Sequence, residues 1–406
     1  MRRGRLTTIV LGALAGLAVV VVGTLAGCQS FGEHASGDRL ARMQRSPEWH
    51  GDRFQNPQPM WSDLRDAFLH ALSGGPDAEP TVPVPVAPTD PAALAVAPAS
   101  GLRVTWFGHS SMLLEVDGRR LFIDPIWSDR ASPVAWAGPR RWYPPTIALD
   151  RLPTVDAVLI SHDHYDHLDT ATIQAMRSWK NLFIVPLGIG AHLARWGIPA
   201  ERIVELDWWQ STRVGALAVT LVPARHASGR LNAQGDLTLW GGFALVGDRH
   251  RVYYSGDTGL TDAMTEIGRR FGPFDVAMIE AGQYDADWPD WHLGPEQSAL
   301  AAQRVRAKAL IPVHWGLFRL AHHGWTEPVE RVLAAAQCAD VTVLTPRPGQ
   351  PIEPTALRPG DSQRWWPRTP WATAAQKPIV ATTDGVTTHR VVLPACPAAS
   401  QSVSER

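Results

Sequence analysis

Cysteine is scarce in this chain of 406 residues, which contains only Cys28, Cys338 and Cys396. So few cysteines cannot build a disulfide framework, although a single Cys338–Cys396 pair stays open. An excess of charge of one sign is also missing, because 38 Lys and Arg residues nearly balance 39 Asp and Glu residues. The net charge of −1 gives no general attraction to nucleic acid, so we expect no nucleic-acid partner.

Apolar residues, by contrast, are plentiful. Their share of 45% allows a sizeable core, and the length suits one large domain or two ordinary ones. The 18 Trp residues are unusually many for this size. They suit a packed core, and some of them an apolar substrate groove.

The N-terminus has the features of a bacterial export signal. Arg2, Arg3 and Arg5 precede an uncharged apolar run over residues 7–26. The run ends in Leu-Ala-Gly-Cys28, which resembles the lipobox of bacterial lipoproteins. This resemblance implies that residues 1–27 are removed and that Cys28 carries lipid. The protein would then be membrane-anchored in the bacterial cell envelope, on the outer membrane facing the periplasm if the cell has two membranes. An uncleaved signal anchor is the alternative, because about 20 apolar residues can span a bilayer.

Composition divides the remaining chain into three parts. Residues 28–100 are expected to contain a polar tether, a short amphipathic helix at 61–72 and a Pro/Ala-rich segment. Residues 101–350 carry strand and helix patterns and form the expected main domain. Residues 351–406 are rich in Pro, Trp and Thr and form a C-terminal extension that the sequence does not place.

The central part predicts strands mixed with helices. Apolar or alternating runs predict strands at residues 102–107, 111–116, 120–124, 155–160, 182–186, 218–223, 251–254, 276–279 and 309–313. Helices are predicted at residues 170–179 and 296–307. This mixture favours a layered α/β architecture.

Four side chains able to bind metal lie within six residues, directly after the apolar run 155–160. They are His162, His164, Asp166 and His167. Imidazole nitrogen and carboxylate oxygen suit Zn²⁺, and they also suit Mn²⁺ or Fe²⁺. Further candidates are His226, Asp257 and His314, each of which follows a predicted strand. Ligands in α/β layers usually bind at the carboxyl ends of strands.

The cluster resembles the His-x-His-x-Asp-His motif of the metallo-β-lactamase superfamily. The resemblance is closest to the branch of N-acyl-phosphatidylethanolamine-hydrolysing phospholipase D. The strings that carry it are Phe107-Gly-His-Ser-Ser111, Asp124-Pro125, Gly138-Pro-Arg-Arg141, the run from Leu152 to Asp169, Tyr254-Ser-Gly-Asp-Thr258 and His314-Trp-Gly-Leu-Phe318. It implies an αββα sandwich, in which two mixed β-sheets are flanked by helices.

The resemblance also implies two divalent metal ions with divided ligand sets. One ion would be bound by His162, His164 and His226, the other by Asp166, His167 and His314, and both by the bridging Asp257. A bridging carboxylate in place of a cysteine argues against the lactamases that give the fold its name. Asp163 and Asp169 are expected to orient His rings beside the ligands.

Three other histidine positions carry separate expectations. His292 precedes a helix start and is predicted either to contact the scissile or leaving-group oxygen or to cap that helix. His109 is interpreted as a structural residue at a strand end. His322 and His323 are predicted to lie in a solvated loop or, alternatively, to line the site.

These patterns predict a binuclear metal-dependent hydrolase. The resemblance implies a phosphodiesterase of the phospholipase D type, which acts on N-acyl-phosphatidylethanolamine or a related phospholipid through a metal-bridging hydroxide. A lactonase or another small-molecule hydrolase of the same fold is the alternative. A third hypothesis is an envelope lipoprotein that binds metal without catalysis.

Overall fold

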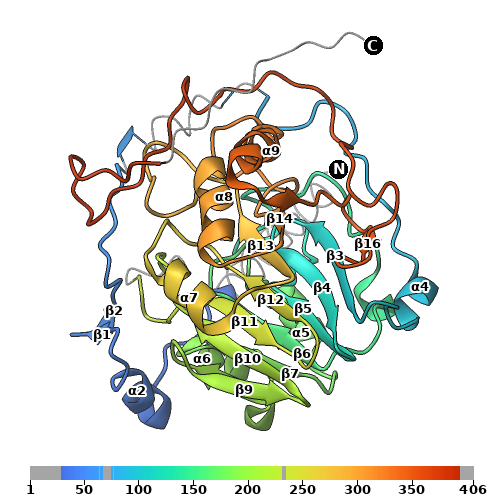
Figure 1. Ribbon diagram of the computed structural model, residues 1–406. Coiled ribbons are helices and arrows are strands. Elements are labelled where there is room, and N and C mark those ends of the chain that lie inside the picture. Colours follow the sequence, from blue (N-terminus) through green and yellow to red (C-terminus); the bar gives the residue numbers. More distant parts are fainter. Residues whose placement is uncertain (1–28, 64, 67–74, 76, 231–234, 394–406) are drawn as a thin grey trace, which may run out of the picture.

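The computed structural model describes residues 29–63, 65–66, 75, 77–230 and 235–393. In this part of the chain, two seven-stranded mixed sheets pack face to face (Figure 1). Helices cover the outer face of each sheet, which confirms the expected αββα sandwich.

The first sheet joins an antiparallel half to a parallel half. Its order is β16-β3-β4-β5-β6-β7-β8, with parallel pairing from β5 to β8. The strands are β3 (Leu102–Gly108), β4 (Ser111–Val116), β5 (Arg119–Ile123), β6 (Ala157–Leu159), β7 (Leu182–Pro186), β8 (Ile203–Leu206) and β16 (Pro351–Ile352). Its outer face is covered by α5 (Thr170–Ala175) and α6 (Ile189–Arg195).

The second sheet has the order β15-β14-β13-β12-β11-β10-β9, with parallel pairing from β12 to β15. Its strands are β9 (Ser211–Val214), β10 (Leu217–Val222), β11 (Gly242–Val246), β12 (Arg251–Tyr254), β13 (Val276–Glu280), β14 (Ala309–Val313) and β15 (Thr342–Val343). Its outer helices are α7 (Ala263–Phe271), α8 (Pro295–Arg304) and α9 (Glu327–Ala339).

Successive side chains of a strand point to opposite faces of its sheet, and this alternation explains how the two sheets and the helix layers pack. In β4, Met112 and Leu114 face the core between the sheets, whereas Leu113 faces the helix layer. In β12, Val252 and Tyr254 likewise point between the sheets, whereas Tyr253 packs under the outer helices. Side chains two residues apart share a face, so these strands are apolar on both faces and are buried on both.

The N-terminal segment, which we expected to be a tether, lies on the sandwich in the structure. It forms α2 (Gly37–Met43) and the short strands β1 (Trp49–His50) and β2 (Arg53–Phe54). Arg39 pairs with the buried Glu205 at the end of β8, at 2.7 Å. Ser46 donates to the Asp207 carboxylate at 3.0 Å. Met43 and Phe54 of this segment are also buried in the core between the sheets. Such isolated apolar residues form no periodic pattern, so hydrophobic patterning did not predict the packing.

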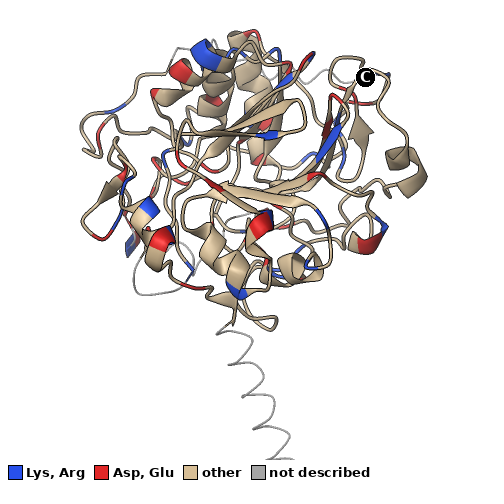
Figure 2. Ribbon diagram, turned by 90° about the horizontal axis from the view of Figure 1, so that it is seen from below, with Lys and Arg blue, Asp and Glu red and all other residues tan. Residues whose placement is uncertain are grey.

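Several sequence-based expectations fall outside the described residues. The export signal with Cys28 lies there, as does most of the helix predicted at 61–72. Cys338, near the end of α9, is disulfide-bonded. In the described ranges, no helix combines the length and the hydropathy needed to cross a membrane. Figure 2 shows acidic and basic residues interspersed over the helices and loops, in keeping with the balanced charge.

Smaller elements complete the sandwich. They are α4 (Pro91–Ala95) and the 3-10 turns η1 (Leu149–Arg151) and η2 (Ala200–Arg202). Beyond β16 the C-terminal extension runs over the surface without regular structure, but it buries Trp366, Ile379 and Ala381. The extension is therefore packed against the domain as far as residue 393.

Candidate metal centre

The loop after β6 brings the first four candidate residues to one edge of the first sheet. It begins at Ser161, whose backbone N–H donates to the Asp124 carboxylate at 2.8 Å. A turn follows, because the backbone N–H of His167 donates to the carbonyl of His164 at 3.1 Å. This turn brings the four side chains together, with His162 and His164 in one group of neighbouring ligand atoms, Asp166 and His167 in another, and His162 and His167 also side by side next to Asp257.

The remaining candidates come from the second sheet. His226 follows β10, Asp257 follows β12 and His314 follows β14. The carboxyl ends of these strands therefore meet the β6 loop across the top of the core. All seven side chains predicted as metal ligands lie close together, although they span residues 162–314.

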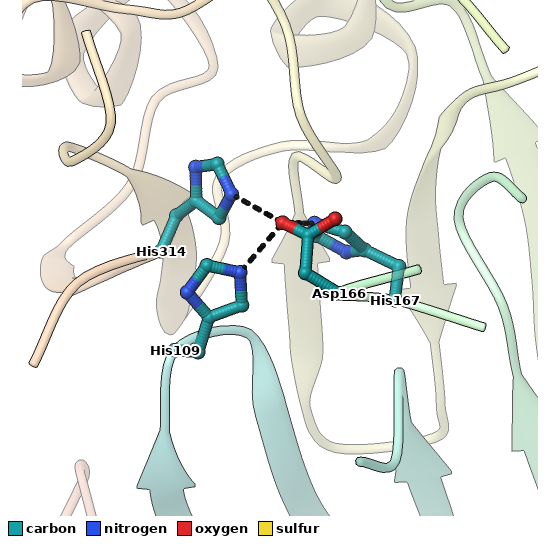
Figure 3. A group of neighbouring side chains, drawn as sticks. All are labelled: His109, Asp166, His167 and His314. Atoms are coloured by element: carbon teal, nitrogen blue, oxygen red, sulfur yellow. Dashed lines mark hydrogen bonds and ion pairs between the residues drawn. The ribbon is translucent and has the colours of Figure 1, made fainter. Parts of the chain in front are cut away.

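The candidate ligand atoms form two adjacent groups, and in each group they all lie within 4.8 Å of one another. One group consists of His162, His164 and His226. The other consists of Asp166, His167 and His314, joined by His109 (Figure 3). These groups match the two ligand sets that the resemblance implies, with His109 as an addition.

Asp257 lies between the two groups. Its carboxylate oxygen Oδ2 is 3.1 Å from His167 Nε2 and 3.2 Å from His314 Nε2. The Nε2 atoms of His162 and His226, from the first group, lie 3.8 and 3.9 Å away. One buried carboxylate thus faces ring nitrogens of both groups, which is the placement required of a bridging ligand.

Unsatisfied buried atoms test whether the site suits metal ions. Among the described residues, Asp257 Oδ1 and His167 Nε2 are buried without a hydrogen-bond partner. Leaving a buried polar atom unpaired costs about 1–3 kcal/mol, and here two such atoms lie inside one cluster of His and Asp side chains. Divalent cations would satisfy both atoms, so the residues present fit a metal centre.

The pKa shifts within the cluster also fit a metal centre. Burial alone would raise the pKa of Asp257, but His167 and His314 hold it well below its usual range. Burial, with help from His167 and His164, lowers the pKa of His162. Burial would also lower the pKa of His314, but Asp257 and Asp166 outweigh it and raise that pKa to about 10. Ionised carboxylates and neutral imidazoles are the ligand forms that metals need, and a bound cation would replace the protons on the more basic rings.

Two buried carboxylates that sequence reasoning missed hold the ligand rings. Asp124, after β5, accepts a hydrogen bond from His167 Nδ1 at 2.8 Å and from the Ser161 hydroxyl at 2.6 Å. Glu280, at the end of β13, lies 2.7 Å from His292 Nδ1 and 3.3 Å from His314 Nδ1. Their shared position at a strand end was the available signal, because the same signal identified His226, Asp257 and His314.

The carboxylates that we expected in this role lie elsewhere. Asp163 accepts from the Gly229 backbone at 2.7 Å and contacts His192. Asp169 caps α5 through the backbone N–H of Ala171. Both were chosen for their closeness in sequence, but they point from the loop toward the protein body. They position the loop and not the rings.

The prediction that His322 and His323 lie in a solvated loop is also wrong, as the packing of His323 shows. The ring of His323 stacks on Tyr284, with 4.4 Å between ring centroids. Its Nε2 accepts a hydrogen bond from the Gln283 backbone at 2.8 Å. His323 therefore supports the loop after β13, which carries residues of the site.

A cavity of about 320 Å³ opens onto the cluster. Its polar side includes His164, Asp166, Asp257, Gln283, His292 and His314. Its apolar side is formed by Trp288, Trp291 and Leu320, and Ser62 from the N-terminal segment completes the lining. His292 thus lies on the cavity wall, and the residue that caps α8 is Gly294.

Comparison with known proteins identifies the family. A sequence profile described as a β-lactamase superfamily domain matches residues 119–315. A UPF0173 metal-dependent hydrolase of Anaeromyxobacter is 32% identical, and the match covers 61% of this chain and 85% of that protein. This chain belongs to the β-lactamase superfamily of metal-dependent hydrolases.

Other relatives of this hydrolase differ in what their names state. An uncharacterised protein of Mycobacterium tuberculosis H37Rv, Rv0906, is 46% identical over 80% of this chain and 89% of its own length. N-acyl-phosphatidylethanolamine-hydrolyzing phospholipase D 1 of Caenorhabditis elegans is 36% identical over 54% of this chain and 65% of its own. An isothiocyanate hydrolase from Delia radicum gut bacteria, 20% identical, has the same fold, with a TM-score of 0.50 over 62% of this chain and 98% of its own.

His109 of this metal-dependent hydrolase lies at a strand end, between β3 and β4, but its ring reaches the metal centre. Its Nε2 is 2.9 Å from Asp166 Oδ2 (Figure 3). In the described part of the chain its buried Nδ1 has no hydrogen-bond partner. A neutral ring therefore carries its proton on Nε2 and donates it to Asp166, which fixes that carboxylate.

We expect His109→Leu to weaken the affinity for the second metal ion by about 10- to 100-fold, the usual effect of losing such a partner. His109→Gln should recover much of the loss, because the glutamine amide can place an N–H near the same position. Competition with a chromogenic chelator would measure both affinities. Equal affinity in His109→Leu and the parent chain would show that Asp166 needs no such donor.

Proposed function

We propose that this hydrolase is a phosphodiesterase of the phospholipase D type, which acts on N-acyl-phosphatidylethanolamine or a related phospholipid. The observation that carries the proposal is the cavity, in which the metal cluster faces Trp288, Trp291 and Leu320. A phosphodiester with an acyl chain nearby needs both surfaces, one charged and one apolar. The name of the nematode relative and the expected lipid anchor at Cys28 support this substrate class, and the anchor would place the enzyme at the bacterial cell envelope.

Each part of the site has a task in this reaction. Two divalent ions, Zn²⁺ or alternatively Mn²⁺ or Fe²⁺, would supply an activated water and neutralise charge on the phosphate. The first His group, the Asp166 group and Asp257 would hold the ions. Glu280 holds Nδ1 of His292, which leaves Nε2 of that ring for substrate. The Glu280 carboxylate would stabilise the protonated form of this ring, which would donate its Nε2 proton to the ethanolamine oxygen as the bond from that oxygen to phosphorus breaks. The proton that the attacking water gives up would restore the protonated ring.

The hydrolysis exchanges one oxygen bond to phosphorus for another. The oxygen of water forms a bond to phosphorus, and the bond between phosphorus and the ethanolamine oxygen breaks. The products are phosphatidic acid and N-acylethanolamine. The cavity is too small for a whole lipid, so the glycerol acyl chains would stay outside it.

The test is lipid turnover by the full chain in mixed micelles, followed by mass spectrometry of the products. We expect N-acyl-phosphatidylethanolamine to yield phosphatidic acid and N-acylethanolamine, with loss of turnover in chelator and recovery on adding Zn²⁺. Elemental analysis in parallel reports the bound metal. If the metal-loaded enzyme cleaves no phospholipid but opens acyl lactones, the phosphodiesterase proposal is wrong and the lactonase alternative takes its place.

A further inference from the structure

The first described residues of the chain are fixed to the domain. The carbonyl of Gln29 accepts a hydrogen bond from Trp196 Nε1 at 2.8 Å. The carbonyl of Ser30 accepts one from Arg230 Nε at 2.7 Å. Gln29 directly follows Cys28 in the sequence. A lipid on Cys28 would therefore hold the domain near one particular face.

That face adjoins the metal centre. Arg230 is fully buried, and its Nη1 donates to the carbonyls of Asp163 and Leu168 at 2.6 and 2.9 Å. Its guanidinium also lies 4.1 Å from the ring centroid of Tyr165. One side chain thus joins Ser30 to both ends of the metal-binding loop, so the attachment point and the catalytic loop form a single packed unit.

A second loop lies beside the same point. Residues 128–130 and 132–135, together with Gln29, Ser30 and Tyr165, line a cavity of about 290 Å³. The next residue, Trp136, is 75% exposed, whereas the Trp residues of the core are buried. Arg130 lies within this loop and donates from Nη1 to the carbonyl of Gly138, and Arg140, after Trp136, lies 3.9 Å from Asp129.

The loop leaves the sheet at the catalytic edge. It follows β5, which pairs in parallel with β6, so both strands end at the same edge of the sheet. An exposed Trp between two Arg residues suits the boundary of a bilayer, where an indole ring packs among lipid head groups and a guanidinium meets phosphate. One lipid chain anchors weakly, and stable anchoring takes a second contact.

We propose that residues 128–140 and 29–30 form a face that contacts a phospholipid bilayer, with Trp136 inserted among the head groups. The lipid on Cys28 would hold this face against the membrane and direct the catalytic edge toward its substrate. The proposal rests on the lipid anchor included in the proposed function, but it does not depend on which bond the enzyme cleaves.

The opposite end of the first sheet supplies a matched control. The short helix α4 lies there, since Arg120 near the start of β5 donates to the carbonyls of Leu94 and Ala95. Ala95 and Ala135 are both exposed alanines, so cysteine at either position should be tolerated. The two positions report on the two ends of the same strand.

The experiment attaches a bimane fluorophore to Ala135→Cys or Ala95→Cys in the full chain. Each protein is placed on phosphatidylcholine–phosphatidylglycerol vesicles with or without a nitroxide head-group lipid, and the parent chain gives the background from its own cysteines. We expect at least about twofold quenching at position 135 and little at position 95. Adding Trp136→Ser to Ala135→Cys should reduce the quenching.

Three results would overturn the proposal. Equal quenching at both positions would mean that the domain has no fixed orientation, and stronger quenching at position 95 would mean that the opposite end faces the lipid. A chain that does not sediment with vesicles would remove the anchor itself. Quenching at position 135 in an enzyme that cleaves no phospholipid would leave the membrane face standing and reject only the proposed substrate.

Discussion

Replacing Asp257 with asparagine should reduce hydrolysis by roughly 10³-fold or more, because a single carboxylate serves both halves of the metal centre. Asp257 Oδ2 lies within 3.9 Å of ring nitrogens from both His groups, and Asn keeps its size but not its charge. Two cations held close together would then repel each other without a shared anion between them. Elemental analysis should show less than the parent metal content.

Asp169→Asn is a suitable control for this variant. Asp169 lies in the same loop region, but it caps α5, and asparagine is an equally good cap. We therefore expect full metal content and activity close to that of the parent, with a modest loss of stability from the other contacts of the carboxylate. If Asp257→Asn kept both metal and turnover, Asp257 would not be the bridging residue.

The local sequence was enough to predict much of the sandwich. Strands β4, β7, β12 and β14 have the bounds that apolar runs predicted, because strands buried on both faces are apolar along most of their length. The helix α9 was missed for the opposite reason. It has an apolar face of Val329, Val332, Leu333 and Ala336, but the charged residues Glu327, Glu330 and Arg331 are buried among them and pair with Glu296 and Arg364, which obscured that face in the sequence.

For the site, too, the residues with a local sequence signal were predicted and the others were missed. Ligands such as His162 and His167 were predicted because they cluster in sequence, and His314 because it follows a strand. No role was predicted for Asp124, which was noted only in the string Asp124-Pro125, or for Glu280, although both also end strands, because neither lies near its histidine partner in the sequence. Their partners His167 and His292 lie 43 and 12 residues away, and only folding brings them into contact.

A final expectation concerns the buried pair of Arg225 and Asp290, which lies just behind the site. The two side chains are 1% and 0% exposed and lie 3.1 Å apart. Asp290 also accepts from the backbone of Trp61 at 2.8 Å and of Thr382 at 2.6 Å. The pair therefore ties the N-terminal segment and the C-terminal extension to the loop that carries His292.

Asp290→Asn should lower the free energy of unfolding by about 3–5 kcal/mol, because it leaves the Arg225 charge buried without its partner. Guanidinium denaturation followed by circular dichroism would measure the loss. Replacing both residues, in Arg225→Met with Asp290→Asn, should cost less than the sum of the single changes, since no unpaired charge remains. Additive losses would mean that the two residues act independently. In Asp290→Asn we also expect a higher KM with unchanged metal content, because the Trp288 and Trp291 wall would loosen while the metal ligands keep their own supports.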